Sequence, residues 1–195
     1  MARLRNTYRF EIRDRSGGDP RSRALPAKAR ALGLDMVKEA RRAKLFFVHG
    51  TIAPEELDLL GRFLFSDSVV ESFSWKRIDT ESVLDRPTLG LAGFSVIEVA
   101  PRPGVTDTVA AEIVRAAREL GISGLDSAST GTRWEIRGDG FDETTLDLLA
   151  RRLFANALVE RWALGEIQPS FIGTGEDQAG SKIPHPETFA VGEMS

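Results

Sequence analysis

The sequence predicts an α+β protein built from two tandem βαββαβ modules with antiparallel sheets. The main observation is an internal repeat: residues 57–73 and 146–162 match without a gap at an offset of 89 residues, with 9 identities in 17 positions. In addition, short stretches alternate apolar and polar residues, which is typical of half-buried strands, and longer stretches place apolar residues at helical spacing. A repeat of this length indicates two copies of one structural unit.

Weaker matches at offsets of 87 and 88 residues extend the repeat in both directions, and small drifts in offset are tolerated in loops. The linker contains Pro87, and the tail is rich in glycine and proline with apolar anchors at Phe171, Ile183 and Phe189. Four segments follow from the repeat: module 1 at residues 1–78, a linker at 79–92, module 2 at 93–166 and an extended C-terminal tail at 167–195.

The first strand and first helix of each module follow from side-chain periodicity. Tyr8, Phe10 and Ile12 share one face of a strand, because alternate residues of a strand point to the same side. In module 2, Asp107 is a suitable N-cap for an amphipathic helix that ends at Gly121. In module 1, Pro26 predicts a helix that is short or begins at that residue, because proline disrupts a helix interior.

The remaining elements repeat in the same order. A strand is expected at residues 45–49 and at 133–137. A second helix is expected near Pro54 in module 1 and after Asp142 in module 2, since proline suits the first helical turn and aspartate suits the N-cap. The last strands are expected at residues 69–75 and 158–164.

One strand differs between the modules. Residues 45–48 are all apolar, whereas residues 133–137 alternate. A strand that is apolar on both sides is expected to be covered on both faces, here by the other module or by a partner protein. A module of about 75 residues is also marginal on its own, because small domains bury a small fraction of their surface. We therefore expect the two modules to pack together.

Composition excludes several classes of site. The 195 residues contain no cysteine, which excludes disulfides, thiolate metal sites and cysteine nucleophiles. There are two histidines, His49 and His185; His49 is interpreted as a polar rim contact and His185 has no evident partner. No apolar run approaches 18 residues and no signal peptide is evident, so we expect a cytoplasmic protein without a membrane span.

Residues 1–44 hold 13 basic and 5 acidic residues, which is interpreted as a solvated surface because no aromatic residues are interleaved for base stacking. A nucleic-acid partner is therefore not expected. We also expect no catalytic, cofactor-binding or metal site on this chain, since no nucleophile, base and orienting group come together.

Candidate functional residues are few. The loops at 16–19 and 101–107 both join a strand to a helix and could hold an anion or small ligand, although a turn with an aspartate cap is the simpler interpretation. The glycine-rich residues 173–180 are interpreted as linker. Glu71 and Glu160 stand at equivalent positions beside apolar neighbours, and are expected to protect an edge strand or to form an ion pair across an interface.

We expect the terminal strand of each module to help form the pairing surface between modules. The aromatic residues Phe73, Trp75, Trp134 and Trp162 are interpreted as core or interface residues. The predicted interface comprises Leu45, Phe47, Glu71, Phe73, Glu160 and Trp162.

Each module resembles PurS, the small subunit of the glutamine-dependent phosphoribosylformylglycinamidine synthase of purine biosynthesis. The resemblance rests on residues 96–107, on residues 120–122, and above all on residues 153–162 with their counterpart at 64–73. It covers about 150 of the 195 residues. The tail resembles the linker that leads into the large subunit in fused versions of the enzyme.

The resemblance implies a specific function. PurS is non-catalytic: it joins the large synthetase subunit to the glutaminase subunit and helps ammonia pass between them, while ATP, Mg and glutamine are used by those partners. PurS is typically a homodimer, with terminal strands exchanged or paired across the interface, so a tandem chain resembles that dimer on one polypeptide, with a pseudo-two-fold axis between the modules. Further self-association remains open.

The sequence is also compatible with two other classes of protein. A tandem small-molecule sensor of the ACT type also has the βαββαβ order, and residues 101–105 resemble its amino-acid-binding loop. A basic nucleic-acid-binding module is the third alternative. Similarity of fold alone does not separate these functions.

Overall fold

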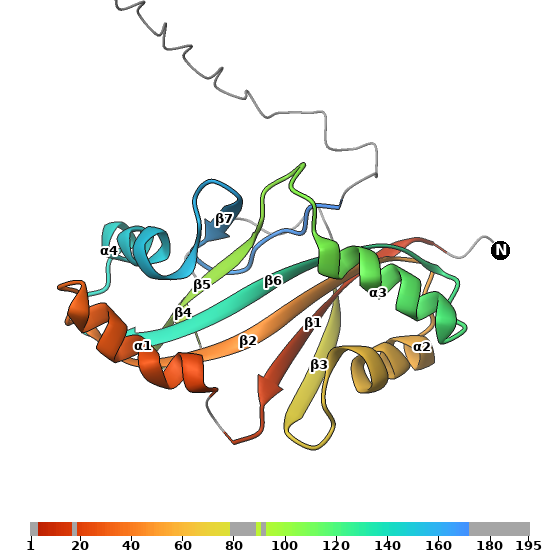
Figure 1. The fold of residues 1–195 in the computed structure, drawn as a ribbon, viewed down its shortest axis with the longest axis horizontal. Coiled ribbons are helices and arrows are strands. Elements are labelled where there is room, and N and C mark those ends of the chain that lie inside the picture. The colour runs from red at the N-terminus through yellow and green to blue at the C-terminus, as the bar shows by residue number, and fades with distance from the viewer. Residues whose placement is uncertain (1–3, 17–18, 79–88, 91–92, 172–195) are drawn as a thin grey trace, which may run out of the picture.

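One antiparallel sheet of seven strands forms the frame of the protein (Figure 1). The computed structural model describes residues 4–16, 19–78, 89–90 and 93–171. The strand order is β3-β1-β2-β6-β5-β4, and β7 pairs with another part of the same edge of β5. The strands are β1 Asn6–Asp14, β2 Val37–Gly50, β3 Glu71–Ile78, β4 Leu89–Gly90, β5 Phe94–Pro101, β6 Leu125–Gly138 and β7 Glu160–Ala163.

The helices follow the expected order. Asp19 accepts the Ser22 N–H at 2.9 Å and caps α1, so this helix begins at Pro20 and contains Pro26, contrary to the prediction of a short helix or one that begins at Pro26. A capping aspartate followed by proline fixes the start of a helix more strongly than an interior proline displaces it. The helices are α1 Pro20–Ala31, α2 Pro54–Leu59, α3 Thr108–Glu119 and α4 Glu143–Leu149, with π-helical turns η1 Leu60–Phe65 and η2 Ala150–Phe154.

The βαββαβ prediction is wrong in one respect. Each half has a single strand of 14 residues, β2 or β6, where the prediction placed two shorter strands. Residues 40–44 contain no glycine or proline that would turn the chain. Gly131 lies within β6, where a Cβ atom would stand 2.9 Å from the Val99 carbonyl oxygen, so this glycine permits close strand approach.

The two long strands pair with each other at the centre of the sheet. Their register places Lys44 opposite Thr132, and these two residues are equivalent at the repeat offset of 88. Outward from this pair, β1 and β3 flank β2, while β5 and β7 flank β6. The terminal strands therefore lie at the two edges of the sheet. The backbone pairing between the modules is made by β2 and β6, and the terminal strands take no part in it, although Phe73 and Trp162 pack on clusters that combine the two halves.

Two apolar clusters lie on the helix side of the sheet, and both combine residues from the two halves. In the first, Phe10 of β1 and Leu60 of the first half pack with Ile113 of α3. In the second, Leu25 of α1 packs with Ile136 of β6 and Leu149 of α4. The first helix of each half thus packs in a cluster that includes the second helix of the other half, as the marginal size of one module led us to expect.

The opposite side of the sheet, here called the second face, is covered as well. Leu45 and Phe47 of β2 are 0% exposed and form a cluster with Ile167, against which Phe171 packs. Phe46 and Val48 belong to the helix-side cluster, so the prediction of a strand covered on both faces is confirmed. The cover on the second face comes from the segment after β7. The expected anchors Ile183 and Phe189 lie outside the described residues.

Candidate functional site

The turn that precedes each terminal strand is built in the same way in both halves. We call residues 66–71 tip 1 and residues 155–160 tip 2. In tip 1 the Glu71 N–H donates to the Asp67 carbonyl oxygen at 2.7 Å, and in tip 2 the Glu160 N–H donates to the Asn156 carbonyl oxygen at 2.7 Å. Figure 1 shows these turns on opposite sides of the molecule, tip 1 leading into β3 and tip 2 into β7.

Glu71 and Glu160 lock these turns. The Glu71 carboxylate accepts the Asp67 N–H at 3.1 Å, and the Glu160 carboxylate accepts the Asn156 N–H at 2.7 Å. Glu71 also forms an ion pair with Lys44 at 2.7 Å, within the chain. Their shared function in the described structure is to close a turn, which sequence reasoning did not anticipate.

An arginine braces each tip from the neighbouring strand end. The Arg15 N–H donates to the Val70 carbonyl oxygen at 2.9 Å, and its Nε donates to the Glu71 carbonyl oxygen at 2.8 Å. Arg102 makes the same two bonds to Val159 and Glu160, at 3.0 and 3.1 Å. Each tip is therefore held in one conformation, which lowers the entropic cost of using it in binding.

Both tips expose aliphatic side chains. Val69 is 81% exposed and Leu158, its equivalent, is 86% exposed; the following residues, Val70 and Val159, are 52% and 43% exposed. Exposed leucines are also shared by the two halves at Leu32 and Leu120, and at Leu59 and Leu148, whereas the exposed Phe63 has diverged to Arg152. What distinguishes the tips is that each carries two adjacent exposed aliphatic residues on a turn held by hydrogen bonds, and such residues can form a contact surface for another protein.

The two strand-to-helix loops share a second repeated device. Asp107 caps α3 by accepting the Ala110 N–H at 3.0 Å, and its other oxygen accepts the backbone N–H and the hydroxyl of Thr130, each at 2.8 Å. Asp19 caps α1, and its other oxygen lies 3.5 Å from Arg42, which is the equivalent of Thr130. Both aspartates therefore connect a helix start to the central strand pair, and the expected aspartate caps are confirmed; residues 17 and 18 of the first loop lie outside the described residues.

The recesses beside these loops differ in chemistry. Recess 1, in the first half, has a volume of about 460 Å³ and is lined mainly by charged groups, among them Arg21, Arg42 and Lys44. Recess 2, in the second half, has a volume of about 430 Å³. Its lining is largely apolar and includes Val105, Val114 and Phe171, and the buried Ser127 hydroxyl in its wall has no hydrogen-bond partner among the described residues.

The six predicted interface residues do not form one site. Leu45 and Phe47 are buried at the centre of the sheet, under the segment after β7. Phe73 packs on the helix-side cluster against Gly61, where a Cβ atom would stand 2.3 Å from the ring. Trp162 packs on the other helix-side cluster, and its indole N–H donates to Asp147 at 2.9 Å. Whether Phe73, Trp162, Glu71 or Glu160 contacts a partner protein remains a prediction.

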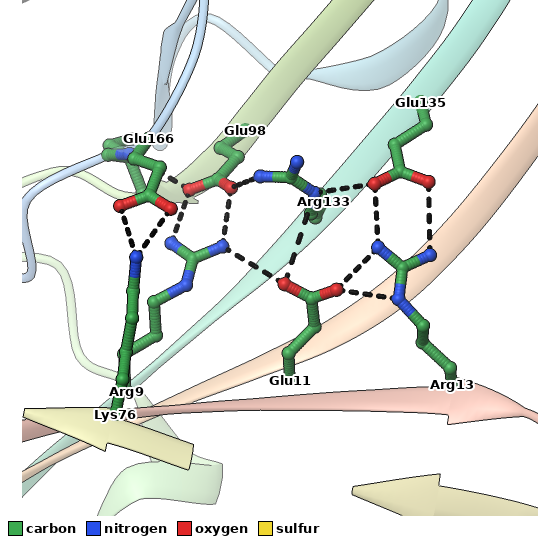
Figure 2. A network of polar contacts seen from close by, with 9 residues as sticks. Arg9, Glu11, Arg13, Lys76, Glu98, Arg133, Glu135 and Glu166 are labelled. Carbon is green, nitrogen blue, oxygen red and sulfur yellow. Dashed lines mark hydrogen bonds and ion pairs between the residues drawn. The ribbon is translucent and has the colours of Figure 1, made fainter. Parts of the chain in front are cut away.

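The second face carries a network of ion pairs that sequence reasoning missed (Figure 2). Arg9 is 3% exposed and Glu98 is 0% exposed, and the two guanidinium NH groups donate to the carboxylate at 2.7 and 2.5 Å. Arg133 donates to the same carboxylate at 2.6 Å, and the Ile167 N–H donates to it at 2.9 Å. Glu98 interrupts the apolar run 96–99, and this was the available signal for a buried charge.

Further members extend the network over the central strands. Arg13 donates to Glu135 at 3.0 and 2.6 Å, and Lys76 donates to Glu166 at 2.7 and 2.9 Å. Burial would raise the pKa of Glu135, but hydrogen bonds from Arg13 and Arg133 outweigh it and lower that pKa. Burial would lower the pKa of Arg9, but its bonds to Glu98 raise it. These groups therefore remain charged and hold the second face together.

The remaining candidates have structural surroundings. The His49 ring lies 3.1 Å from the Thr7 hydroxyl and 5.8 Å from the Phe171 ring, which agrees with a polar rim contact. His185 and residues 173–180 lie outside the described residues. Within the described part of the chain, no group of three or more acidic or histidine side chains is placed to hold a metal ion, and no helix is long and apolar enough to cross a membrane.

Comparison with known proteins adds no family. A scan against protein-family models finds no match, and a search of curated proteins finds none either.

Proposed function

We propose that this chain is a non-catalytic, PurS-like component of phosphoribosylformylglycinamidine synthase, which bridges the synthetase and glutaminase subunits and supports ammonia transfer between them. The observation that carries the proposal is the pair of equivalent, exposed aliphatic tips on opposite sides of one sheet. A protein that connects two others needs two separate contact surfaces on a rigid frame.

The arrangement of the halves supports the proposal. In the central strand pair, Lys44 lies opposite its own repeat equivalent, Thr132, so the two halves pair with each other symmetrically, as two copies of one module would. An isologous pairing of this kind is the usual outcome when two identical modules associate. On this proposal the tandem chain is a covalent form of such a dimer, with tandem modules around a pseudo-two-fold axis.

The difference between the recesses supports a bridge between two unlike partners. Tip 1 adjoins recess 1, because Glu71 belongs to both, and tip 2 adjoins recess 2 through Arg102. One end therefore offers an aliphatic tip beside charged groups, and the other offers an aliphatic tip beside an apolar hollow. Complementary partners for the two ends must differ, as a synthetase and a glutaminase do.

The test is co-purification with the large synthetase subunit and the glutaminase subunit from the same source. We expect Val69→Asp and Leu158→Asp each to weaken the binding of one partner, because each places a carboxylate where the partner would bury an aliphatic side chain. Matched controls are Leu32→Asp and Leu120→Asp, which alter exposed leucines at the ends of α1 and α3 and should leave both partners bound. Absence of any complex with wild-type protein refutes the proposal.

The proposal also predicts that the isolated chain releases no ammonia from glutamine. It has no cysteine to act as the thiol nucleophile that the resemblance assigns to such glutaminases. Ammonia release by the pure chain, measured against a glutaminase as the positive control, would contradict this.

A tandem amino-acid sensor of the ACT type is the second candidate, and recess 2 is the observation that favours it. Its volume lies within the usual range for small-ligand sites, and Ser127 offers a polar group without a partner among the described residues. A thermal-shift screen with amino acids and nucleotides separates the candidates: a sensor is stabilised by a ligand at saturating concentration, whereas a bridging component is not.

A further inference from the structure

The outer edge of β3 is the feature that neither function uses. Among the described residues β3 pairs only with β1, and the register between them runs through all eight residues of β3 without a bulge. The strand contains no proline. On the other side of the sheet β7 has only four residues. A long, regular edge strand is a ready template for pairing with another chain.

The orientation of the backbone groups follows from one hydrogen bond. The Arg15 N–H donates to the Val70 carbonyl oxygen at 2.9 Å, which extends the β1–β3 ladder by one residue pair. Hydrogen-bonding direction alternates along an antiparallel strand. Ser72 and Ser74 therefore direct their backbone groups toward β1. The residues whose N–H and C=O groups point outward are Glu71, Phe73, Trp75 and Arg77.

The strand lacks an effective charge barrier against pairing. Lys76 points to the second face, where Glu166 neutralises it at 2.7 Å. Glu71 is paired with Lys44 at 2.7 Å. Lysine on an edge strand usually discourages association, but a lysine that is neutralised within its own chain repels an incoming strand much less.

We propose that β3 pairs with the β3 of a second copy of this chain, antiparallel and centred on Ser74. In this register the outward residues face one another: Glu71 lies opposite Arg77 and Phe73 lies opposite Trp75, each twice. Aromatic pairs are favourable cross-strand neighbours, and the pairing of Glu71 with Arg77 avoids like charges directly opposite each other. On the second face, Ser72 lies opposite Lys76 and Ser74 faces its own copy. This register therefore sets no like charges opposite each other and brings the aromatic residues of the two strands together, which favours a second copy of the same strand as the partner.

Other registers fit less well. Pairing centred on Phe73 would place Glu71 opposite Trp75, and pairing centred on Trp75 would place Phe73 opposite Arg77. Both would lose the pairing of Glu71 with Arg77 and would leave an outward residue at the end of the strand without its partner. This inference does not depend on the proposed function, because a chain can bridge two subunits as a monomer or as a dimer.

A single cysteine tests the register directly, since the native chain has none. At the centre of the proposed pairing the two Ser74 residues form a pair without hydrogen bonds, whose Cα atoms are about 4.5 Å apart, within the range for a disulfide. Ser74→Cys should therefore form a reducible dimer under mild oxidation. Ser72→Cys is the matched control on the same face of the same strand; it lies opposite Lys76, so the two cysteines would be roughly 14 Å apart and should not cross-link.

Sedimentation equilibrium of the full-length chain, up to about 1 mM, measures the association itself. We expect a concentration-dependent dimer. Ser74→Arg sets two guanidinium groups against each other and should raise the dimer Kd by roughly fivefold or more. Ser74 is exposed, so the melting temperature of the monomer should not change. A wild-type dimer whose Kd Ser74→Arg leaves unchanged would overturn the proposal, because another surface would then be responsible.

The rates of disulfide formation test the proposal in the case where sedimentation detects no wild-type dimer. Faster cross-linking of Ser74→Cys than of Ser72→Cys supports the proposal even if the wild-type dimer is too weak to detect by sedimentation. Equal rates for the two cysteines, or a faster reaction of Ser72→Cys, would overturn it.

Discussion

In the first half of the molecule the central strand presents Leu45 and Phe47 to the second face, whereas the second half presents Arg133 and Glu135 at the equivalent positions, 88 residues later. The frame around them is the same. The leucine and phenylalanine are covered by Ile167, while the arginine and glutamate bind charges that include Arg13 of β1. The halves have therefore become complementary to each other, and neither could replace its counterpart without mismatching the second face.

The tips and recesses show the same contrast. Tip 1 and tip 2 share their hydrogen bonds, their locking glutamate and their arginine brace. The recesses next to them do not share their chemistry, one being charged and the other apolar. The turns and their hydrogen bonds are therefore retained in both copies, while the side chains beside them have diverged. The following predictions test this division, from the largest expected effect to the smallest.

Removal of the buried Arg9 guanidinium should cause the largest loss of unfolding free energy. Arg9→Ala leaves the fully buried Glu98 carboxylate with one arginine fewer, and the expected loss of unfolding free energy is about 3–5 kcal/mol. Val96 occupies the equivalent position in the second half, and Val96→Ala should cost about 2 kcal/mol, since only methyl groups are lost. Urea denaturation compares the two. A smaller loss for Arg9→Ala would show that Arg133 alone satisfies Glu98.

Truncation of the terminal-strand tryptophan should destabilise the whole chain. Trp162→Ala removes the bond to Asp147 and packing on the second helix-side cluster, so about 3 kcal/mol is expected. We also expect weaker co-purification with the synthetase. The control is His185→Ala, which should change neither the melting temperature nor the complex. If the two variants were tolerated equally, Trp162 would be neither a core nor a contact residue.

Loss of each capping aspartate should reduce the free energy of unfolding according to the number of hydrogen bonds that its carboxylate accepts. Asp107→Ala loses the Ala110 cap and both bonds from Thr130, and should cost about 2 kcal/mol. Asp19→Ala loses the Ser22 cap and a contact of 3.5 Å to Arg42, and should cost about 1 kcal/mol. Thermal melts of the two variants measure the difference. The reverse order would mean that the charge of Arg42 outweighs the bonds of Thr130.

The smallest effect concerns acid stability. Because the pKa of Glu135 is lowered in the folded protein, its contribution is present above about pH 5 and is lost as the pH falls through the folded-state pKa. Glu166 behaves in the same way. Glu135→Gln should therefore flatten the acid side of the stability profile, with the profile of wild type as the reference. Phe47 stands at the position equivalent to Glu135 in the first half. Because phenylalanine does not titrate, this position contributes nothing to the pH dependence of stability.

The repeat made the frame predictable from the sequence. The two helices of each half, its first and last strands, the caps at Asp107 and Asp142, and the doubly covered strand at residues 45–48 were expected and are observed. The continuous strand from Val37 to Gly50 was not expected, because an apolar-polar pattern does not show whether a strand ends when no turn residue is present. That distinction depends on the partner strand β6, which satisfies the backbone along its whole length.

The site was less predictable for a physical reason. The alternation of apolar residues with Arg9, Glu11 and Arg13 is typical of a half-buried strand, whereas the face that carries these charged residues is covered by the segment containing Glu166 and Ile167. A local pattern distinguishes the two faces of a strand but does not show what lies over each of them. The locking function of Glu71 and Glu160 also depends on a turn geometry that their spacing alone does not specify.

The central pairing of Lys44 with Thr132 has a consequence for synthesis on the ribosome. The two residues are 88 positions apart in the sequence. At elongation rates of about 5–20 residues per second, several seconds pass between the synthesis of β2 and the synthesis of its partner strand β6. During that interval the nascent first half presents the strand through which the two halves later pair, and a neighbouring nascent chain on the same polysome presents the same strand. Tethering both halves on one polypeptide favours the intended pairing, because the second half arrives at a high local concentration.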